Sequence, residues 1–368
     1  MAFTTIDNSE LYFQTKLYTG NGGTQSITFD GSENMQPDWV WIKSRNNSGV
    51  NGDHFLQDSV RGATISFKSN SSNAEFTQSN MVTSFDSNGF SLGNEDEFNR
   101  SGTTFTSWNW KAGGSASSNS NGSITSSVSA NTTAGFSIVS WTGNAVTGAT
   151  IGHGLGVKPD WIILKNRSPD IANWQVYHSS LGATKYLQLN SNGTVTTSNT
   201  RWNNTEPTST VFTTGSSGDV KGDSSGEPFI AYCFTSIKGY SKFGQYTGNG
   251  SNDGRYIHLG FRPAFVMLKR TDSTTNANWA ISDNKRLNNS GNQDGGKGNY
   301  VPHTLAANLD NNEAHFGGGS GNKQDFLSNG FKLRQDSNYG NASSSTYVYM
   351  AFAESPFVNS NGIPTNAR

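Results

Sequence analysis

The sequence predicts an all-β protein built from three tandem antiparallel β-sandwich domains. The first observation behind this prediction is composition: of 368 residues, 42 are Gly, 12% are aromatic and only 14% are charged. Turn formers and the large aromatic residues that favour strands are therefore abundant, and charged helix formers are few. A disordered chain would lack the aromatic residues, so the composition indicates a folded protein of short strands and long loops.

The second observation is a repeat, because two sequence markers recur three times in the same order. The first marker, YTGN at residues 18–21, returns as WTGN at 141–144 and as YTGN at 246–249. The second marker begins at Pro37, Pro159 and Pro263 and reads PDWVWIK, PDWIILK and PAFVMLK. Both markers recur at nearly the same offsets. We therefore interpret residues 18–112, 136–239 and 240–368 as three β-sandwich repeats.

The strand patterns inside each repeat favour a sandwich of jelly-roll type. Residues 39–42, directly after the first proline marker, are apolar at every position, which is typical of a central strand covered on both faces. In residues 107–111, Trp108 and Trp110 share one face while polar residues share the other, which predicts one face in solvent. Asn-Gly pairs at 88–89, 192–193 and 329–330 are typical of hairpin turns.

Two segments fall outside the repeats. Residues 113–135 consist almost entirely of Ser, Gly, Asn, Ala and Thr, which is the composition of a flexible linker. Residues 1–17 precede the first marker, and we interpret them as an N-terminal attachment segment. No comparable spacer separates the second and third repeats near residue 239.

Charge, hydropathy and cysteine content exclude several classes of protein. A formal net charge of −1 argues against electrostatic binding to nucleic acid or to an anionic membrane. No apolar run approaches the roughly 20 residues that span a bilayer, so membrane insertion is not expected. The first residues lack the apolar stretch of a signal peptide, which predicts synthesis in the cytoplasm. The single cysteine, Cys233, excludes a disulfide framework within the chain.

No catalytic pattern emerges from the sequence. The six histidines show no metal-ligand spacing, and there is no GxSxG motif for a nucleophilic serine. Glycoside hydrolysis would need two positioned carboxylates, and acidic residues here are scarce and predicted to lie in loops. We therefore expect a protein that is not an enzyme and that needs no cofactor.

Two candidate binding sites remain. Asn94, Glu95, Asp96 and Glu97 form the one acidic cluster, which either holds Ca²⁺ through oxygen ligands or is simply a solvated turn. Trp202 lies in polar, loop-like surroundings (TRWNNT), where an exposed indole would stack on a sugar ring. We take Trp202 as the candidate ligand-binding residue and favour the solvated turn for the acidic cluster.

Two further tryptophans, Trp174 and Trp279, also have polar neighbours. They occupy equivalent places in the second and third repeats. Equivalent positions favour a shared structural role over a ligand-binding role.

The repeated markers resemble a known family. Together with residues 153–168 (HGLGVKPDWIILKNRS) and the opening residues 1–22, they are similar to repeated domains of virion structural proteins from marine tailed bacteriophages, including cyanophages. Such proteins are described as tail fiber, fiber-like or concanavalin-like. The resemblance covers nearly the whole chain and is weaker in the third repeat, where Ala264 and Phe265 replace Asp and Trp. It implies a concanavalin-like β-sandwich fold and a place on the virion beside other virion proteins, but it carries over no ligand and no catalytic residue.

The leading expectation is therefore a fiber or fiber-like appendage of a bacteriophage virion that contacts host surface polysaccharide. Homo-oligomers are the default for such assemblies, and a trimer is favoured. The alternative is a capsid or neck decoration protein without a receptor role, which the lack of heptad or collagen-like shaft repeats favours. A glycan depolymerase and a free carbohydrate-binding protein are the remaining hypotheses.

Overall fold

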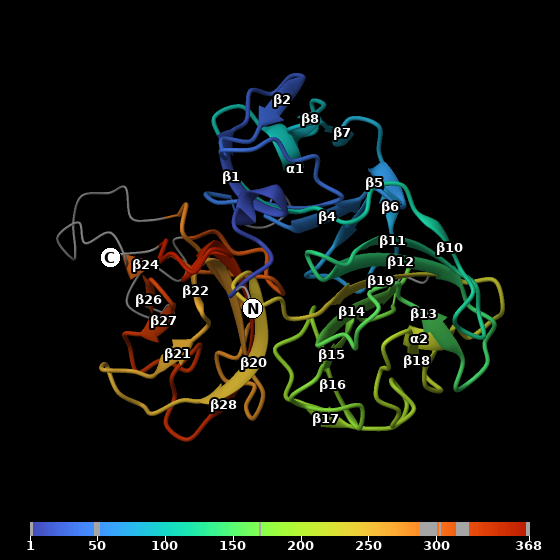
Figure 1. Ribbon diagram of the computed structural model, residues 1–368. Coiled ribbons are helices and arrows are strands. Elements are labelled where there is room, and N and C mark those ends of the chain that lie inside the picture. The colour runs from blue at the N-terminus through green and yellow to red at the C-terminus, as the bar shows by residue number, and fades with distance from the viewer. Residues whose placement is uncertain are drawn as a thin grey trace.

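The computed structural model describes residues 3–47, 52–168, 171–286, 300–301, 303–313 and 324–365. Over these residues the fold is all-β, and neighbouring strands within each sheet run antiparallel (Figure 1). The helical elements whose bounds lie within the described residues are three short turns: η1 (Ser9–Leu11), α1 (Asp96–Asn99) and α2 (Gly218–Lys221). The predicted all-β antiparallel architecture is confirmed.

The strands between residues 13 and 110 pair with one another and are called the first strand group. Its larger sheet has the order β1 (Phe13–Thr19), β9 (Thr104–Trp110), β3 (Trp39–Ser44), β4 (His54–Asp58), β5 (Gly62–Lys68) and β6 (Phe76–Thr77). Its smaller sheet has the order β2 (Gln25–Thr28), β8 (Gly89–Leu92) and β7 (Val82–Asp86).

The second strand group spans residues 117–234. Its larger sheet has the order β10 (Ser117–Asn119), β11 (Ser126–Asn131), β12 (Phe136–Thr142), β19 (Pro228–Phe234), β14 (Trp161–Asn166), β15 (Gln175–His178), β16 (Lys185–Gln188) and β17 (Thr196–Thr197). The smaller sheet pairs β13 (Thr150–Gly152) with β18 (Val211–Thr213).

The third strand group spans residues 241–356. Its larger sheet has the order β20 (Ser241–Thr247), β28 (Thr346–Pro356), β22 (Phe261–Arg270), β23 (Ala280–Asp283) and β25 (Leu305–Ala306). The smaller sheet has the order β21 (Tyr256–His258), β27 (Gly330–Leu333), β26 (Gln324–Leu327) and β24 (Tyr300–Val301).

The three larger sheets share one plan. In each, the closing strand (β9, β19 or β28) lies between two marker strands. One carries the start of the YTGN or WTGN marker (β1, β12 or β20), and the other carries the apolar run of the proline marker (β3, β14 or β22). The register is also shared, because Trp39 pairs with Trp110, Trp161 with Phe234, and Phe265 with Phe352. Figure 1 shows the three groups as three lobes arranged around a common centre rather than in a row.

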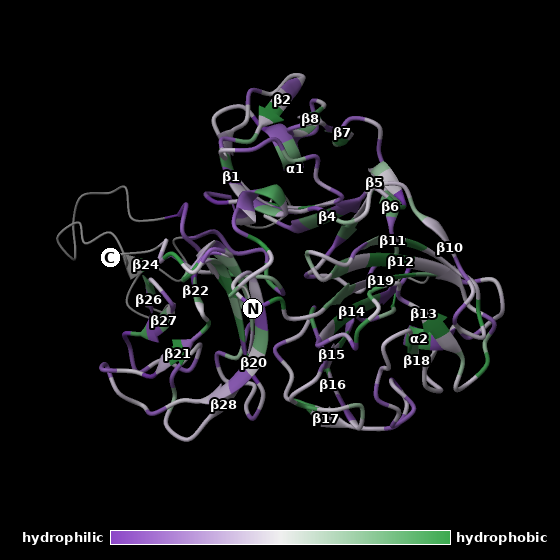
Figure 2. Cartoon of the chain, viewed as in Figure 1, coloured by the Kyte–Doolittle hydropathy of each residue, from purple (hydrophilic) through white to green (hydrophobic). Residues whose placement is uncertain are grey.

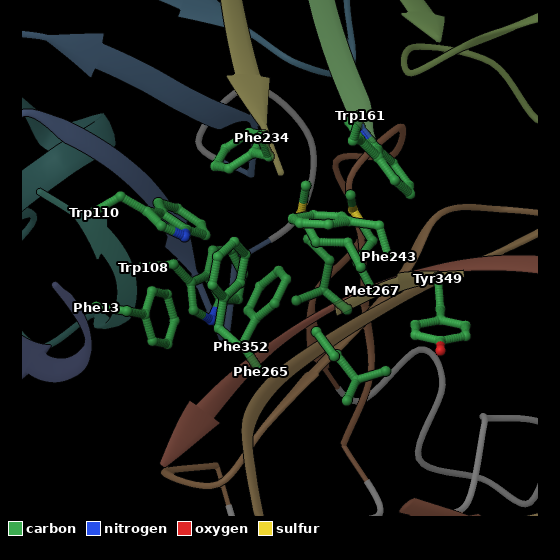
Figure 3. Close-up of a cluster of buried hydrophobic side chains, with 14 of the residues drawn as sticks. Phe13, Trp108, Trp110, Trp161, Phe234, Phe243, Phe265, Met267, Tyr349 and Phe352 are labelled. Carbon is green, nitrogen blue, oxygen red and sulfur yellow. The ribbon is translucent and has the colours of Figure 1, made fainter. Parts of the chain in front are cut away.

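A continuous aromatic core fills that centre (Figure 3). The equivalent residues Trp110, Phe234 and Phe352 come from the three closing strands, and the Phe352 ring lies 5.6 Å from the first and 5.8 Å from the second. Phe13 at the start of β1 stacks on Phe352 at 5.3 Å, which joins the third group to the first. Figure 2 shows the hydrophobic residues concentrated on the strands, while the loops are mostly hydrophilic or neutral.

The central strand β3 is buried on both faces, as its apolar run predicts. Trp39 and Trp41 face the shared core, whereas Val40 and Ile42 face the core between the two sheets of the first group. The expected solvent face of the closing strand is wrong, because Ser107 and Asn109 are also fully buried. β9 lies inside its sheet, and the Asn109 side-chain nitrogen donates to the Gln14 carbonyl of the neighbouring β1 at 2.9 Å, which gives the buried nitrogen a partner.

The two segments assigned outside the repeats differ from their predictions. Residues 113–135 contain β10 and β11, and β11 pairs along its whole length with β12. A Ser-rich segment can do this because backbone hydrogen bonds hold the ladder, while Val128 points into the core of the second group. The boundary after residue 17 falls inside β1, and Ile6 is buried in the shared core, so the described residues 3–17 belong to the folded body.

Candidate functional site

Trp202 does not lie on the surface. Its side chain is 1% exposed, and its ring packs edge-on against Tyr177 at 5.8 Å inside the core of the second group. Trp202 lies within a turn that is closed by a hydrogen bond from the Asn203 backbone N–H to the Asn199 carbonyl. This turn places the indole over the core of the second group. The prediction of Trp202 as a ligand-binding residue is therefore corrected, because a buried ring cannot stack on a sugar.

The acidic cluster does not form a shared cation site. Asn94 accepts from the Asn80 amide at 2.9 Å, and Glu95 accepts from the same amide at 3.2 Å. Asp96 lies 3.8 Å from Arg100, and Glu97 lies 3.4 Å from Lys68. Within the described residues, no group of three or more His, Cys, Asp or Glu side chains is gathered closely enough to hold a metal.

A buried ionic network joins the first strand group to the second. Asp58 and Arg61 form an ion pair at 2.6 Å with both side chains fully buried. The phenol of Tyr232, from the second group, donates to the same Asp58 carboxylate at 2.8 Å. Around it, Glu75 bridges Arg61 at 3.3 Å and Arg167 at 2.7 Å. Each buried charge thus has a partner of opposite sign, as a buried charge requires.

The same arrangement recurs where the third group meets the first. Asp283 and Arg286 form a fully buried ion pair at 2.6 Å, again three residues apart in sequence. Here the donor across the junction is the Trp108 indole nitrogen, which lies 2.9 Å from the Asp283 carboxylate. A half-buried pair, Arg45 with Glu313 at 2.7 Å, also crosses this junction.

At the junction between the second and third groups, a histidine takes the position that Asp58 and Asp283 have at the other two junctions. His178 pairs with Trp161 across β14 and β15, just as Asp58 pairs with Trp39 and Asp283 with Phe265. Burial lowers the pKa of His178 from 6.5 to about 4, so the imidazole is neutral near pH 7. This junction therefore keeps the geometry of the other two without a buried ion pair at that position.

Trp174 and Trp279 have the shared structural role that their equivalent positions predict. The Trp174 indole donates to the Lys68 carbonyl of the first group at 3.0 Å. The Trp279 indole donates to the Gln188 carbonyl of the second group at 2.9 Å. His54 takes the equivalent place in the first group, where it lies against the backbone of Ala306. The three junctions are thus copies of one head-to-tail interface that closes into a ring.

One surface pocket of about 290 Å³ lies beside the first junction. It is lined by Lys68, Asn73, Ala74, Glu75 and Phe76. The Lys68 ammonium lies 5.9 Å from the centre of the Phe76 ring and 2.6 Å from Asp53. The one ring in this lining, Phe76, therefore has a cation near it that is paired with Asp53.

The smaller sheet of the third group presents a different kind of surface. Tyr256 on β21 is 42% exposed, and it is the one aromatic residue among the described large hydrophobic residues that reach solvent to this extent. Its phenol donates to the carbonyl oxygen of Asn329 at 3.1 Å. A Cβ atom on Gly330 would lie 3.1 Å from the edge of the Tyr256 ring, so the ring extends along this glycine.

A row of charged residues continues from Tyr256 across the same face of the sheet. Lys332 is the partner of Tyr256 on β27, and Asp325 is the partner of Lys332 on β26. Lys332 pairs with Asp253 at 2.7 Å, and Arg334 pairs with Asp325 at 2.5 Å. Two cations and two carboxylates therefore lie beside one exposed ring. We call Tyr256, Asp253, Asp325, Lys332 and Arg334 the β21 face.

Sequence reasoning missed the β21 face because Tyr256 carries no motif. An available signal was the position itself: the strand that reads QSIT in the first group and TIG in the second reads YIH in the third. The aromatic residue thus departs from small residues at the matching place. Trp202 drew attention instead because its neighbours are polar, although a loop that covers a core has the same local composition.

Comparison with known proteins places the chain in a family. An all-β protein of antiparallel sheets, closed into a ring by buried junctions, is the class that the fold and its contacts define. The model of a domain of unknown function, DUF7483, matches residues 8–356, so the chain belongs to that family. No curated protein and no solved structure matches the chain. None of the helical turns in the described residues is long and apolar enough to reach across a membrane.

Proposed function

We propose that this protein is a non-enzymatic structural component of a bacteriophage virion, built as three tandem antiparallel β-sandwich domains of jelly-roll or concanavalin-like type. The recurring markers and their resemblance to virion structural proteins of marine tailed phages support the proposal. The sheet plan, repeated three times in the same register, supports the division into tandem domains.

The observation that carries the structural role is the closed ring of three copies of one junction. Phe352 contacts rings from both other groups, and the Asp58–Arg61 and Asp283–Arg286 pairs are fully buried. Opening any one junction would expose aromatic surface or a buried charge, and both are costly in water. A body held in this way suits a part that must keep its shape outside the cell.

The leading form of the proposal is a fiber-like appendage whose partner is host surface polysaccharide, with other virion proteins at its base. The low charge and the many hydroxyl and amide side chains support contact with glycans rather than with nucleic acid. Homotrimer formation stays a prediction. Sedimentation of the purified chain checks it, because a trimer has three times the chain mass of 39.6 kDa.

A capsid or neck decoration protein is the second candidate, and one observation favours it. The contact between Trp108 and Asp283 joins the third group to the first, so the three groups form a closed ring rather than an elongated row. A compact ring suits a cap on a particle surface better than the shaft of a long fiber.

Localisation on intact particles tests the proposal. Purified virions are analysed by mass spectrometry for this chain and then labelled with an antibody against the third strand group for electron microscopy. Label at the tail or fiber tips supports the appendage, and label spread over the head or neck supports decoration. Absence of the chain from purified particles would overturn both forms.

A further inference from the structure

The three strand groups repeat one plan, so a residue that breaks the repeat is informative. Ile27, Ile151 and Ile257 occupy matching places in the smaller sheets, and each is buried. The residue before each of them points to the opposite face, and it is Ser26, Thr150 or Tyr256. Only the third group thus presents a large ring at this place, on a molecule whose described aromatic residues are otherwise buried or half-buried.

Tyr256 reaches solvent from β21, where it is 42% exposed. Figure 1 shows β21 and β27 on the side of the third group that faces away from the other two groups. The phenol hydroxyl donates to Asn329, which holds the ring in place, so little rotamer freedom would be lost on binding. A fixed, half-exposed aromatic ring offers a flat apolar surface with a polar edge.

The charges beside the ring indicate which ligand chemistry fits. Within the β21 face, the carboxylates Asp253 and Asp325 balance the cations Lys332 and Arg334. A further cation beside β21, Lys242, already donates to the His258 carbonyl at 2.7 Å. A polyanion or an anionic membrane would need an excess of cations to bind. Paired carboxylates and cations instead offer hydrogen-bond acceptors and donors in alternation, which suits a neutral ligand rich in hydroxyl groups.

We propose that the β21 face is a binding site for neutral polysaccharide, with the C–H face of a hexose ring on Tyr256 and its hydroxyl groups on Lys332 and Asp253. This inference rests on the proposed function, because it names the glycan class and the residues through which the particle would contact its host. The equivalent faces of the first and second groups have only Ser26 and Thr150 at this place and lack the ring.

Affinity electrophoresis tests the site on the full chain. Native gels are cast with dextran, laminarin or galactomannan as neutral polysaccharides of glucose, mannose and galactose, and with alginate as the acidic one. The wild-type chain is expected to be retarded by at least one neutral polysaccharide. Retardation by none of them, or by alginate alone, would overturn the proposal.

Matched variants assign the binding to this face. Tyr256→Ala is expected to weaken retardation about tenfold, the usual order for one aromatic contact. Tyr256→Phe keeps the ring and loses only its hydrogen bonding to Asn329, so it is expected to retain most of the binding. Ser26→Ala, the matching position in the first group, is expected to change nothing. An equal loss in Ser26→Ala would show that the face is not the site.

A purely structural role for Tyr256 gives a different pattern, because a ring beside Gly330 also stiffens the hairpin. In that case Tyr256→Ala lowers Tm and leaves retardation unchanged, which overturns the site. The test on virions has its own outcome. If the chain binds polysaccharide but is missing from purified particles, the binding site is supported and the proposed virion function is overturned.

Discussion

Tyr232 and Asp58, 174 residues apart in sequence, form a 2.8 Å hydrogen bond that joins the second strand group to the first. The Asp58 carboxylate is fully buried and already holds Arg61, so the phenol supplies one of its remaining donors. The contact is charge-assisted and shielded from water, which makes it stronger than a typical surface hydrogen bond.

We expect Tyr232→Phe to lower the free energy of unfolding by about 1–3 kcal/mol, because a buried carboxylate loses a donor that water cannot replace. Tyr18→Phe is the matched control, since the Tyr18 phenol donates to the neutral Phe98 carbonyl inside the first group. Its cost should be smaller, about 1 kcal/mol. Urea unfolding of both variants checks the difference, and equal losses would contradict the special role of Tyr232.

The shared core predicts that damage at its centre reaches all three strand groups. Phe352→Ala removes a ring that touches Trp110, Phe234 and Phe265, and should cost about 3–5 kcal/mol. Hydrogen exchange should then rise in all three groups. Phe98→Ala, within the first group's own core, is the control and should loosen mainly that group. A rise confined to the third group in Phe352→Ala would show that the groups open independently.

The strands were predictable from sequence because their pattern depends on nearby residues. The apolar run at Trp39–Trp41 indicates a strand covered on both faces, and the structure buries it on both. Ser107 and Asn109 could not be placed in this way. An alternating polar pattern predicts a solvent face unless the chain elsewhere covers it, and Asn109 is covered by Gln14, 95 residues away.

The junctions between the strand groups could not be predicted from the sequence, for the same reason. Asp58 and Arg61 stand three residues apart in a plain polar turn, and nothing local indicates that Tyr232 will reach them. The equivalence of Trp174 and Trp279 was the one readable sign of a repeated junction. Trp202 shows the opposite error, because polar neighbours in a loop do not tell whether the loop lies over a core.

Acid should destabilise the ring through its buried histidines. Burial lowers the pKa of His178 to about 4 and lowers that of His54 well below 6.5, and Asp160 opposes the shift at His178 only in part. Between pH 6.5 and 4 the unfolded chain therefore binds more protons than the folded chain. The stability that these residues contribute is present above pH 6.5 and is lost as the pH falls toward 4.

Thermal unfolding measured from pH 7.5 to pH 4 checks this pH dependence. A shift from 6.5 to about 4 corresponds to on the order of 3 kcal/mol for His178. His178→Gln should flatten the fall in Tm over this range, although its Tm at pH 7.5 is lower if packing against Trp161 suffers. An identical fall in wild type and His178→Gln would contradict the assignment.

Substitutions at Trp202 and Tyr256 should differ in their effect on stability, because one ring is packed in the core and the other is exposed at the surface. Trp202→Ala empties a site that is 1% exposed, so we expect a loss of about 3–5 kcal/mol in the free energy of unfolding. Its indole nitrogen finds no hydrogen-bond partner among the residues that the structure describes, so Trp202→Phe should recover much of that loss through packing alone. Tyr256→Ala changes a half-exposed ring and should cost less than about 1 kcal/mol. Urea unfolding at pH 7.5 measures all three, and a Trp202→Ala chain as stable as wild type would mean that the loop opens and exposes the indole after all.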